Sequence, residues 1–266
     1  MSTSDLEATA RRFVAARRNA ALLAEYPGSV PETLEDAYRV QDAAIALWPD
    51  SIAGWKVGQV RSEHQARFGN DRILGPIFSR HIHIGNGETE MPLFDGGFAV
   101  IEAEYIAVLG EKLPKNKVDW TPTEAMSVVS DLRVGIETAG SPLPALNEYG
   151  AAAVVSDFGA HGGLVVGPSI ANWRHRDTDT FECKVFMNGA QVGTGGPRNL
   201  KNGIARSVQA TLESLAARGH PIKSGLFIST GATTGVHAAS PGDRARVSFG
   251  DDGDVHCRIV PADPEQ

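Results

Sequence analysis

The chain has 266 residues, of which 42% are hydrophobic and 21% are charged, and its formal net charge is −7. These values are ordinary for a globular protein and exclude a collagen-like or low-complexity chain. No basic run and no apolar stretch of membrane-spanning length occurs, so neither nucleic acid nor a membrane is an expected partner. Because the N-terminus also lacks the apolar core of a signal peptide, we expect a soluble, cytoplasmic protein.

The first fifty residues predict two helices. Apolar residues at every third or fourth position indicate a first helix, with Ser4 and Glu7 as its capping box and Pro27-Gly28 as its break. A second helix is predicted between Pro31 and Pro49, since proline suits a first helical turn and stops a helix at its end.

After the second helix the pattern changes to short β segments. A helix interrupts them from Thr121 to Leu132, with Thr121 and Glu124 as its capping box, and another is predicted from Asn202 to Arg218, ending at Gly219. The predicted strands are residues 54–60, 81–84, 98–109, 133–138, 163–166, 182–187, 226–229, 244–249 and 255–260.

Together these elements predict an α+β fold. A small helical or α/β N-terminal portion is expected over residues 1–80, followed by a β-rich body with two helices over residues 81–266. Asn188-Gly189 predicts a two-residue hairpin turn inside this body. Cys183 and Cys257 are predicted to be reduced core thiols, and a disulfide between them stays an open alternative.

Two acids stand out in the predicted strand 98–109. Glu102 and Glu104 are two residues apart, so both carboxylates project from the same face of the strand. Their neighbours on that face are mostly apolar, which predicts burial, and a divalent cation would compensate two buried carboxylates. The alternative is the solvated face of an edge strand. Oxygen ligands without a nearby cysteine favour Mg²⁺, Mn²⁺ or Ca²⁺ over zinc.

Two further charged residues lie in short apolar strands. Glu137, in the predicted strand 133–138, is a candidate third carboxylate at such a site, and the alternative is a salt-bridge partner. Lys56, between Trp55 and Val57, is a candidate general acid or base whose pKa burial could shift. The alternative for Lys56 is a surface lysine whose stem lies along the sheet.

Several polar residues near glycines are weaker candidates. Asp157 follows an apolar run and precedes a glycine-containing turn, where backbone amides approach a ligand, but aspartate is also a common turn residue. His81, His83 and His161 are candidate ligands or acid/base groups, or ordinary surface or core histidines. The loop 229–235 offers hydroxyls and amides for a carboxylate, or is a polar turn.

Several segments along nearly the whole chain carry a resemblance. They are LEDAYRVQ (34–41), GWKVG (54–58), IEAEYIAVLG (101–110), GIET (135–138), TGATTG (230–235) and PGD (241–243). Together they resemble the 2-keto-4-pentenoate hydratase and 4-oxalocrotonate decarboxylase family, within the fumarylacetoacetate hydrolase-like superfamily. The resemblance implies a distorted β-sandwich or roll body, like the C-terminal part of fumarylacetoacetase. It also implies a homo-oligomer, with a complex with a pathway neighbour left open.

The resemblance also implies residue roles. Lys56 would be the acid/base residue, Asp157 a catalytic residue at the edge of the pocket, and Thr234 a residue that lines the substrate carboxylate. Arg80 and His161 stand where this chain departs from the family, and we take them as candidate substrate-binding residues. The implied ligands of Mg²⁺ or Mn²⁺ are Glu102, Glu104 and Glu137.

The implied chemistry is metal-dependent catalysis on a 2-oxo acid or 2-hydroxydienoate through an enolate, as in the catabolism of aromatic compounds. We expect a hydratase, which is a lyase, with decarboxylation of an oxalocrotonate as the first alternative. The second is C–C hydrolysis of an acylpyruvate, for which His81 or His161 could supply the base. An alternative of a different class is a non-catalytic accessory subunit, suggested by the departures around Arg80 and Phe158.

Overall fold

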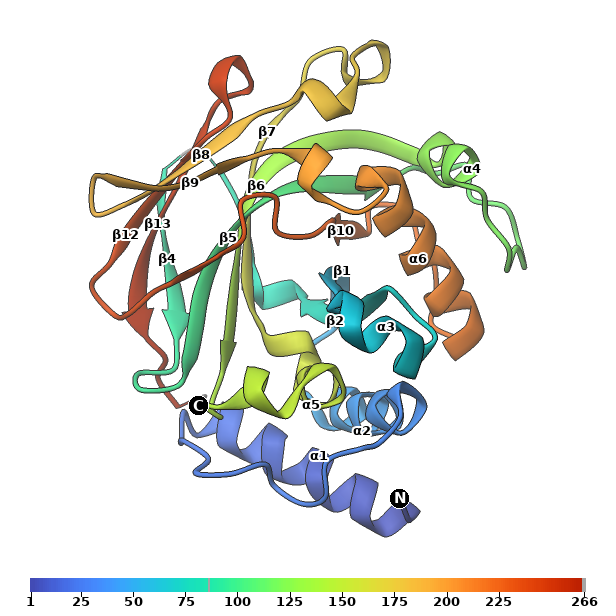
Figure 1. Cartoon of the computed structure of the whole chain (residues 1–266), viewed down its shortest axis with the longest axis vertical. Coiled ribbons are helices and arrows are strands. Elements are labelled where there is room, and N and C mark those ends of the chain that lie inside the picture. The colour runs from blue at the N-terminus through green and yellow to red at the C-terminus, as the bar shows by residue number, and fades with distance from the viewer. Residues whose placement is uncertain (86, 265–266) are drawn as a thin grey trace.

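A computed structural model describes residues 1–85 and 87–264 and shows helices packed on two sheets (Figure 1). The larger sheet curls into a half-barrel, and the five-stranded sheet lies beside it. The helices α1 (Thr3–Arg18) and α2 (Leu34–Leu47) close one end of the molecule, and α6 (Gly203–Arg218) packs beside the larger sheet. The arrangement confirms the predicted α+β fold class.

The helices of the described residues are α1 (Thr3–Arg18), α2 (Leu34–Leu47), α3 (Ser62–Phe68), α4 (Pro122–Ser127), α5 (Ala151–Ser156) and α6 (Gly203–Arg218). The larger sheet has the strand order β2 (Arg72–Phe78), β1 (Ile52–Gln59), β10 (Phe227–Ser229), β5 (Phe98–Leu109), β6 (Val129–Ser141), β7 (His161–Ser169) and β3 (Ile82–Ile84), and β11 (Val236–Ala238) also pairs with β5. The smaller sheet has the order β4 (Glu88–Leu93), β13 (Asp254–Pro261), β12 (Arg244–Ser248), β8 (Cys183–Met187) and β9 (Ala190–Gly195).

The first helix begins earlier than its predicted cap. Ser2 is the N-cap, and its hydroxyl accepts a hydrogen bond from the Asp5 backbone N–H at 3.2 Å. The predicted capping box of Ser4 and Glu7 is therefore wrong, because Ser2 already supplies the acceptor that the first turn lacks. The buried face of α1 packs on α2 through Leu6 and Ala10.

The helix predicted from Thr121 to Leu132 is shorter than expected. Its capping box of Thr121 and Glu124 is confirmed, but α4 ends at Ser127 and β6 starts at Val129. The residues from Val129 onward pair with β5, where Leu132 faces Ala107. The segment forms a strand despite its local helical pattern, because pairing with β5 satisfies its backbone hydrogen-bonding groups and buries Leu132 completely.

Several elements of the structure were absent from the sequence prediction. They are α3, α5, β2, β4, β9 as a defined strand, and β11, so the body has a helix, α5, beyond the two expected. The hairpin between β8 and β9 is confirmed, with Asn188 and Gly189 both in the left-handed region at φ of 50° and 84°.

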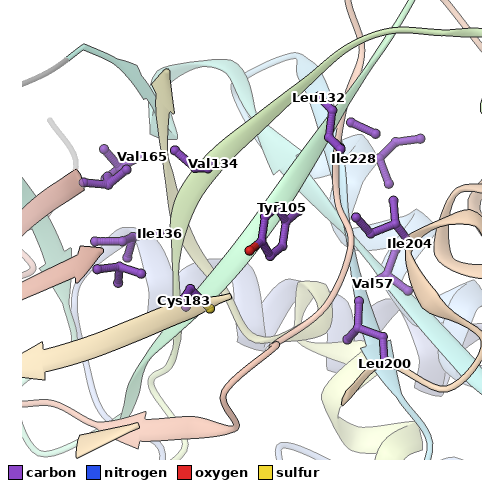
Figure 2. Close-up of a cluster of buried hydrophobic side chains, with 14 of the residues drawn as sticks. Val57, Tyr105, Leu132, Val134, Ile136, Val165, Cys183, Leu200, Ile204 and Ile228 are labelled. Atoms are coloured by element: carbon purple, nitrogen blue, oxygen red, sulfur yellow. The ribbon is translucent and has the colours of Figure 1, made fainter. Parts of the chain in front are cut away.

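The main apolar core packs the half-barrel against the smaller sheet on one side and against α6 on the other (Figure 2). The outer face of β5 supplies Ile101, Ala103 and Tyr105, and the Tyr105 ring packs against Phe181 and Phe249. Each fully buried side chain of this size contributes roughly 1.5–3 kcal/mol, so this layer fixes β5 against the smaller sheet. Cys183 lies in the same core, and it and Cys257 are free and buried, as predicted.

The predicted boundary between residues 80 and 81 stays a prediction about folding units. Strands β1 and β2, which precede it, pair in the same sheet as β5 to β7, which follow it. In the part of the chain that the structure describes, none of the helices has the length and apolar character needed to cross a membrane.

Candidate functional site

Three carboxylates meet on the inner face of the half-barrel. Glu102 and Glu104 project from β5, and Glu137 on β6 lies directly opposite Glu102 in the strand register. One oxygen from each carboxylate lies within 4.8 Å of the others. Glu104 and Glu137 are completely buried, and Glu102 is partly exposed where it borders a cavity. The sheet therefore brings together the three acids that the sequence singled out.

Burial and mutual repulsion make this cluster costly without a cation. Loss of water raises the pKa of Glu102 to about 7 and raises the pKa of Glu104 well above its usual range, with neighbouring carboxylates adding to both. Ser229 and the Gly231 N–H donate to Glu104 Oε2, the latter at 2.8 Å. Among the described residues, no hydrogen-bond donor reaches Glu104 Oε1 or Glu137 Oε2.

Among the described residues, Lys56 supplies the one cationic group of the cluster. It lies on β1 opposite Ser229 of β10, and its ammonium forms an ion pair with Glu137 Oε1. Burial by itself would lower the pKa of Lys56, but the surrounding carboxylates, Glu137 first, outweigh it and raise the pKa. The side chain is thus held as a buried ammonium, which answers the alternative of a surface lysine.

The donor set fits a hard divalent cation. With all three carboxylates ionised, as metal ligands are, the single ammonium would leave an excess of two negative charges, which a divalent cation would neutralise. Two carboxylate oxygens without a donor lie in the same cluster, and all the ligand atoms are oxygens. Oxygen ligands of this type suit Mg²⁺, Mn²⁺ or Ca²⁺, and neutralising the charge would offset the desolvation of the acids.

The curl of the sheet explains how β1 reaches β6. Two strands, β10 and β5, lie between them in the sheet order, yet Lys56 contacts Glu137 because the strands wrap around a common interior (Figure 1). Gly135 on β6 faces Glu104, and a Cβ there would lie 2.8 Å from both Ile106 Cγ1 and the Val165 carbonyl oxygen. A larger residue at position 135 would push the strands apart beside the acids.

A cavity of about 630 Å³ opens from this cluster. Lys56 and Glu102 line it at the acid cluster, and the segments that follow β1 and precede α5 form other parts of its wall. Gly159 and Ala160 line it as well, in a turn where Phe158, Gly159 and Ala160 all have positive φ, at 53°, 65° and 59°. Such backbone is strained for non-glycine residues and persists only when its surroundings hold it.

The turn is held by Arg17, which no sequence pattern marked as a site residue. Arg17 of α1 pairs with both carboxylate oxygens of Asp157, and it donates to the carbonyls of His161 and Gly140, each at 2.8 Å. Its only sequence signal was a basic residue in the apolar stripe of the first helix. Asp157 does not line the cavity, so its predicted catalytic role stays a prediction, and its observed contact is this buried ion pair.

The two histidines next to this ion pair form a contact of their own. His81 Nδ1 lies 3.3 Å from His161 Nε2, and neither residue lines the large cavity. Burial, with Arg17 adding to it, lowers the pKa of His81 to about 4, and burial lowers the pKa of His161 well below its usual range. Both rings are therefore neutral at physiological pH.

The other predicted substrate residues are spread over the surface around the site. The Arg80 backbone N–H donates to Asp50 at 2.9 Å, and its exposed side chain reaches the Pro49 carbonyl. Arg80 lines a separate, smaller cavity together with His81 and His83. The Thr234 hydroxyl lies 3.0 Å from His237 Nε2, in the loop whose Ala232 and Val236 line the large cavity.

Comparison with known proteins identifies relatives in sequence and in fold. No family model matches the chain. Over 107 residues it is 32% identical to a curated 4-oxalocrotonate decarboxylase of Pseudomonas putida, and this alignment covers 40% of each protein. The aligned part is thus less than half of that relative's length.

The similarity in fold covers nearly the whole chain. A solved 4-oxalocrotonate decarboxylase from Pseudomonas putida G7, complexed with calcium and acetate, matches with a TM-score of 0.81 and 23% identity over 98% of this chain and 99% of that chain. A second such structure, complexed with magnesium and adipate, matches with a TM-score of 0.79 and 22% identity over the same shares.

A fumarylpyruvate hydrolase from Pseudomonas aeruginosa, in complex with Mn²⁺ and pyruvate, is similar over 78% of this chain and 89% of its own, with a TM-score of 0.56 and 18% identity. These matches confirm the predicted fold and the resemblance found in the sequence.

Proposed function

We propose that this chain is a Mg²⁺- or Mn²⁺-dependent decarboxylase that acts on an unsaturated 2-oxo dicarboxylate of the oxalocrotonate type. The observation that carries the proposal is the buried Lys56 ammonium beside three carboxylates at the end of a cavity. Buried charges in such excess are costly unless they bind a ligand. The sequence and fold similarity to 4-oxalocrotonate decarboxylases supports the choice of substrate.

The three carboxylates and Lys56 would have different roles in this reaction. Glu102, Glu104 and Glu137 would hold the divalent ion, which supplies Lewis-acid stabilisation for negative charge on a 2-oxo oxygen. The C–C bond to the distal carboxylate breaks, CO₂ leaves, and the bonding electrons move through the double bond to the 2-oxo group. The product takes up one proton, which the Lys56 ammonium beside Glu137 would supply.

A hydratase is the second candidate, and it was the first expectation from the sequence. The observation that favours it is that Asn147 and Glu148 line the cavity and could orient a water molecule. Proton transfer by Lys56 to carbon would serve hydration of a 2-hydroxydienoate equally well. We place the decarboxylase first because the curated relative and the two solved structures with TM-scores of 0.81 and 0.79 carry that name.

The C–C hydrolase receives less support. That reaction needs a base for water near the reacting carbon, for which the sequence suggested His81 or His161. Both lie outside the lining of the large cavity, in contact with each other and close to Arg17. A non-catalytic subunit is also less well supported, because a cluster of buried carboxylates with unsatisfied oxygens destabilises a protein that makes no use of it.

The test is turnover of 4-oxalocrotonate, 2-hydroxypenta-2,4-dienoate and an acylpyruvate, each followed by ultraviolet absorbance with Mg²⁺, with Mn²⁺ and with EDTA. We expect metal-dependent loss of oxalocrotonate with release of CO₂. Glu104→Gln should remove it, whereas Glu111→Gln, an exposed acid away from the cavity, should not. Turnover of the dienoate alone would favour the hydratase, and no turnover of any substrate would overturn the enzyme assignment.

The remaining roles stay proposals of the same kind. We propose Thr234 as a residue near the substrate carboxylate, because its loop borders the cavity. We propose that the protein is cytoplasmic and forms a homo-oligomer. Size-exclusion chromatography with light scattering would measure the oligomeric state. Arg80 and His161 are weaker substrate-binding candidates than the sequence suggested, since neither lines the large cavity.

A further inference from the structure

The large cavity has a second charged region besides the acid cluster. Arg61 and His64 line it, and both come from the segment that follows β1. Arg61 is five residues beyond Lys56, so their Cα atoms are at most about 17 Å apart along extended chain. One cavity thus joins the Lys56 ammonium and the carboxylates to an arginine nearer its mouth, where the residue is exposed.

The Arg61 guanidinium lacks an anionic partner among the described residues, unlike two arginines nearby. Among the described residues, no ion pair or side-chain hydrogen bond involves its guanidinium, whereas Arg72 and Arg206 both pair with Asp71. Its contact with His64 is through the backbone, where the His64 N–H donates to the Arg61 carbonyl at 2.8 Å. The guanidinium is therefore available to an anion inside the cavity.

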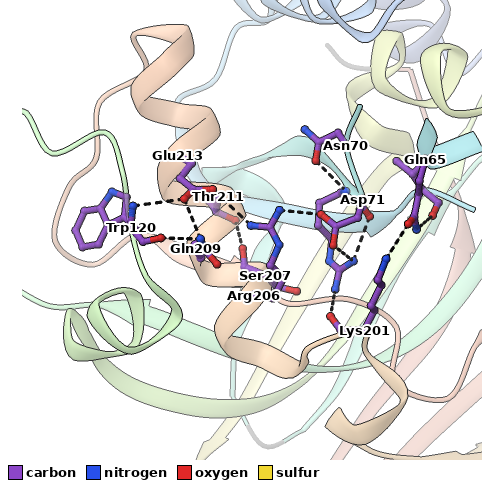
Figure 3. Close-up of polar contacts among 12 residues, drawn as sticks. Gln65, Asn70, Asp71, Trp120, Lys201, Arg206, Ser207, Gln209, Thr211 and Glu213 are labelled. Atoms are coloured by element: carbon purple, nitrogen blue, oxygen red, sulfur yellow. Dashed lines mark hydrogen bonds and ion pairs between the residues drawn. The ribbon is translucent and has the colours of Figure 1, made fainter. Parts of the chain in front are cut away.

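The segment that carries Arg61 is fixed at both ends (Figure 3). Gln65 donates to the Val60 carbonyl at 2.8 Å and accepts from Lys201 Nζ at 2.8 Å. After α3, Asp71 accepts from Arg206 of α6, also at 2.8 Å. These contacts tie α3 to the start of α6, so the backbone of Arg61 and His64 is positioned against the cavity and not left as a free loop.

We propose that Arg61, with His64 as a second donor, binds the distal carboxylate of the substrate and makes the site selective for 2-oxo dicarboxylates over 2-oxo monocarboxylates. This inference rests on the proposed function, since the 2-oxo end must lie at the acid cluster. Arginine presents a planar pair of N–H donors that matches a carboxylate, and the three buried acids disfavour a second carboxylate at their own end of the cavity.

The chemistry of the proposed reaction predicts where this contact acts. The distal carboxylate loses its charge as it leaves as CO₂, so a guanidinium on it stabilises bound substrate and not the departing group. Removing Arg61 should therefore raise KM without lowering kcat. Glu148 also lines the cavity, and Glu148→Gln should strengthen the binding of a dianion by removing a like charge.

The test compares 2-oxohexanedioate with 2-oxohexanoate, which differ only in the distal carboxylate. Binding of each is measured by calorimetry in Mg²⁺, which requires no turnover. The wild type should bind the dicarboxylate at least about tenfold more tightly. Arg61→Ala should remove this preference by weakening the dicarboxylate alone, Arg61→Lys should keep part of it, and Lys115→Ala, an exposed charge outside the cavity, should keep all of it.

The outcomes separate this inference from the proposed function. Equal binding of both compounds by the wild type, or equal weakening of both by Arg61→Ala, overturns the role of Arg61 while leaving the 2-oxo acid site in place. If neither compound binds in the presence of Mg²⁺, the proposed function fails and the role of Arg61 fails with it. Circular dichroism of each variant shows whether a loss of binding comes from a loss of fold.

Discussion

Two groups of charged side chains lie inside this molecule, and their charge balance differs. In the first, Arg17 and Asp157 form a buried pair, and the guanidinium also reaches the carbonyls of His161 and Gly140. In the second, three carboxylates share one ammonium, and oxygens of Glu104 and Glu137 have no donor among the described residues.

The difference separates a structural role from a binding role. A buried pair whose hydrogen bonds are satisfied is stable by itself and fixes the segments that it joins, here α1 and the strained turn 158–160. A buried cluster with excess charge and unsatisfied oxygens is stable only with a further ligand. The first group therefore supports the wall of the cavity, and the second is the place where a cation would bind.

The largest expected effect comes from Glu104→Gln. Loss of one ligand and its charge should lower activity by about a thousandfold or more, as expected when a principal source of charge stabilisation is lost. The protein without metal should be as stable as the wild type or more so, because a neutral amide avoids the burial cost and the repulsion that raise the pKa of Glu104. Thermal melting with Mg²⁺ and with EDTA checks this, and a Mg²⁺-dependent shift of normal size in the variant would contradict it.

Lys56→Met should separate catalysis from metal binding. Without its proton donor, turnover should fall by roughly a hundredfold to ten-thousandfold. The Mg²⁺-dependent shift in melting temperature should persist, because Glu137 remains and no longer pairs with the ammonium. Steady-state kinetics and melting curves on the same preparation give both readings. An unchanged turnover number would remove Lys56 from the reaction.

Arg17→Met tests the structural group. It leaves the Asp157 carboxylate buried without its partner, which costs about 3–5 kcal/mol of unfolding free energy. Arg11→Met on the same helix removes an exposed pair with Glu7 and should cost well under about 1 kcal/mol. Urea unfolding measures both. Asp157→Leu in the Arg17→Met background should recover part of the loss, and no recovery would show that Arg17 acts through other contacts.

The smallest effect is the pH dependence that His81 contributes. Its pKa is about 4 in the folded protein and about 6.5 when unfolded, so the unfolded chain binds the proton first as pH falls. The stabilisation is complete above about pH 6.5 and is lost as the pH falls toward 4. Its size is on the order of 1–2 kcal/mol, reduced by partial exposure. The titratable and charged groups that face His81 are His161, Arg17, Asp50, Arg80 and His83.

A difference experiment isolates this contribution from the many acids that titrate in the same range. The unfolding free energy of wild type minus that of His81→Gln should decrease between pH 7 and pH 5, because the variant lacks the proton site. Urea unfolding of both proteins at both pH values gives the four unfolding free energies required. A difference that is constant with pH would show that folding does not lower the pKa of His81.

The strand that carries the first two acids was predictable because its signal is local. Alternating side chains in residues 98–109 put Glu102 and Glu104 on one face, and β5 has these same limits. The late helix and the hairpin at Asn188-Gly189 were also predictable, since each depends on a few adjacent residues. Strand β2 was missed because its Gly75 and Pro76 are turn residues in a local pattern, yet they pair with β1.

The roles of Asp157, Arg80 and the histidines depended on contacts that no local pattern contains. Arg17 and Asp157 are 140 positions apart, and only packing of α1 against the body joins them. The same packing places His161 beside His81 and away from the cavity lining, which weakens its candidacy for substrate binding.

The sequence alone determined which acids share a face, because a strand has a period of two whatever surrounds it. It also determined that their neighbours are apolar. Only the tertiary structure decided that Glu137 lies opposite Glu102, that Lys56 reaches them across two strands, and that Arg61 shares their cavity. The reason is physical, since register and sheet curvature follow from how many strands and helices pack together, and no single segment carries that information.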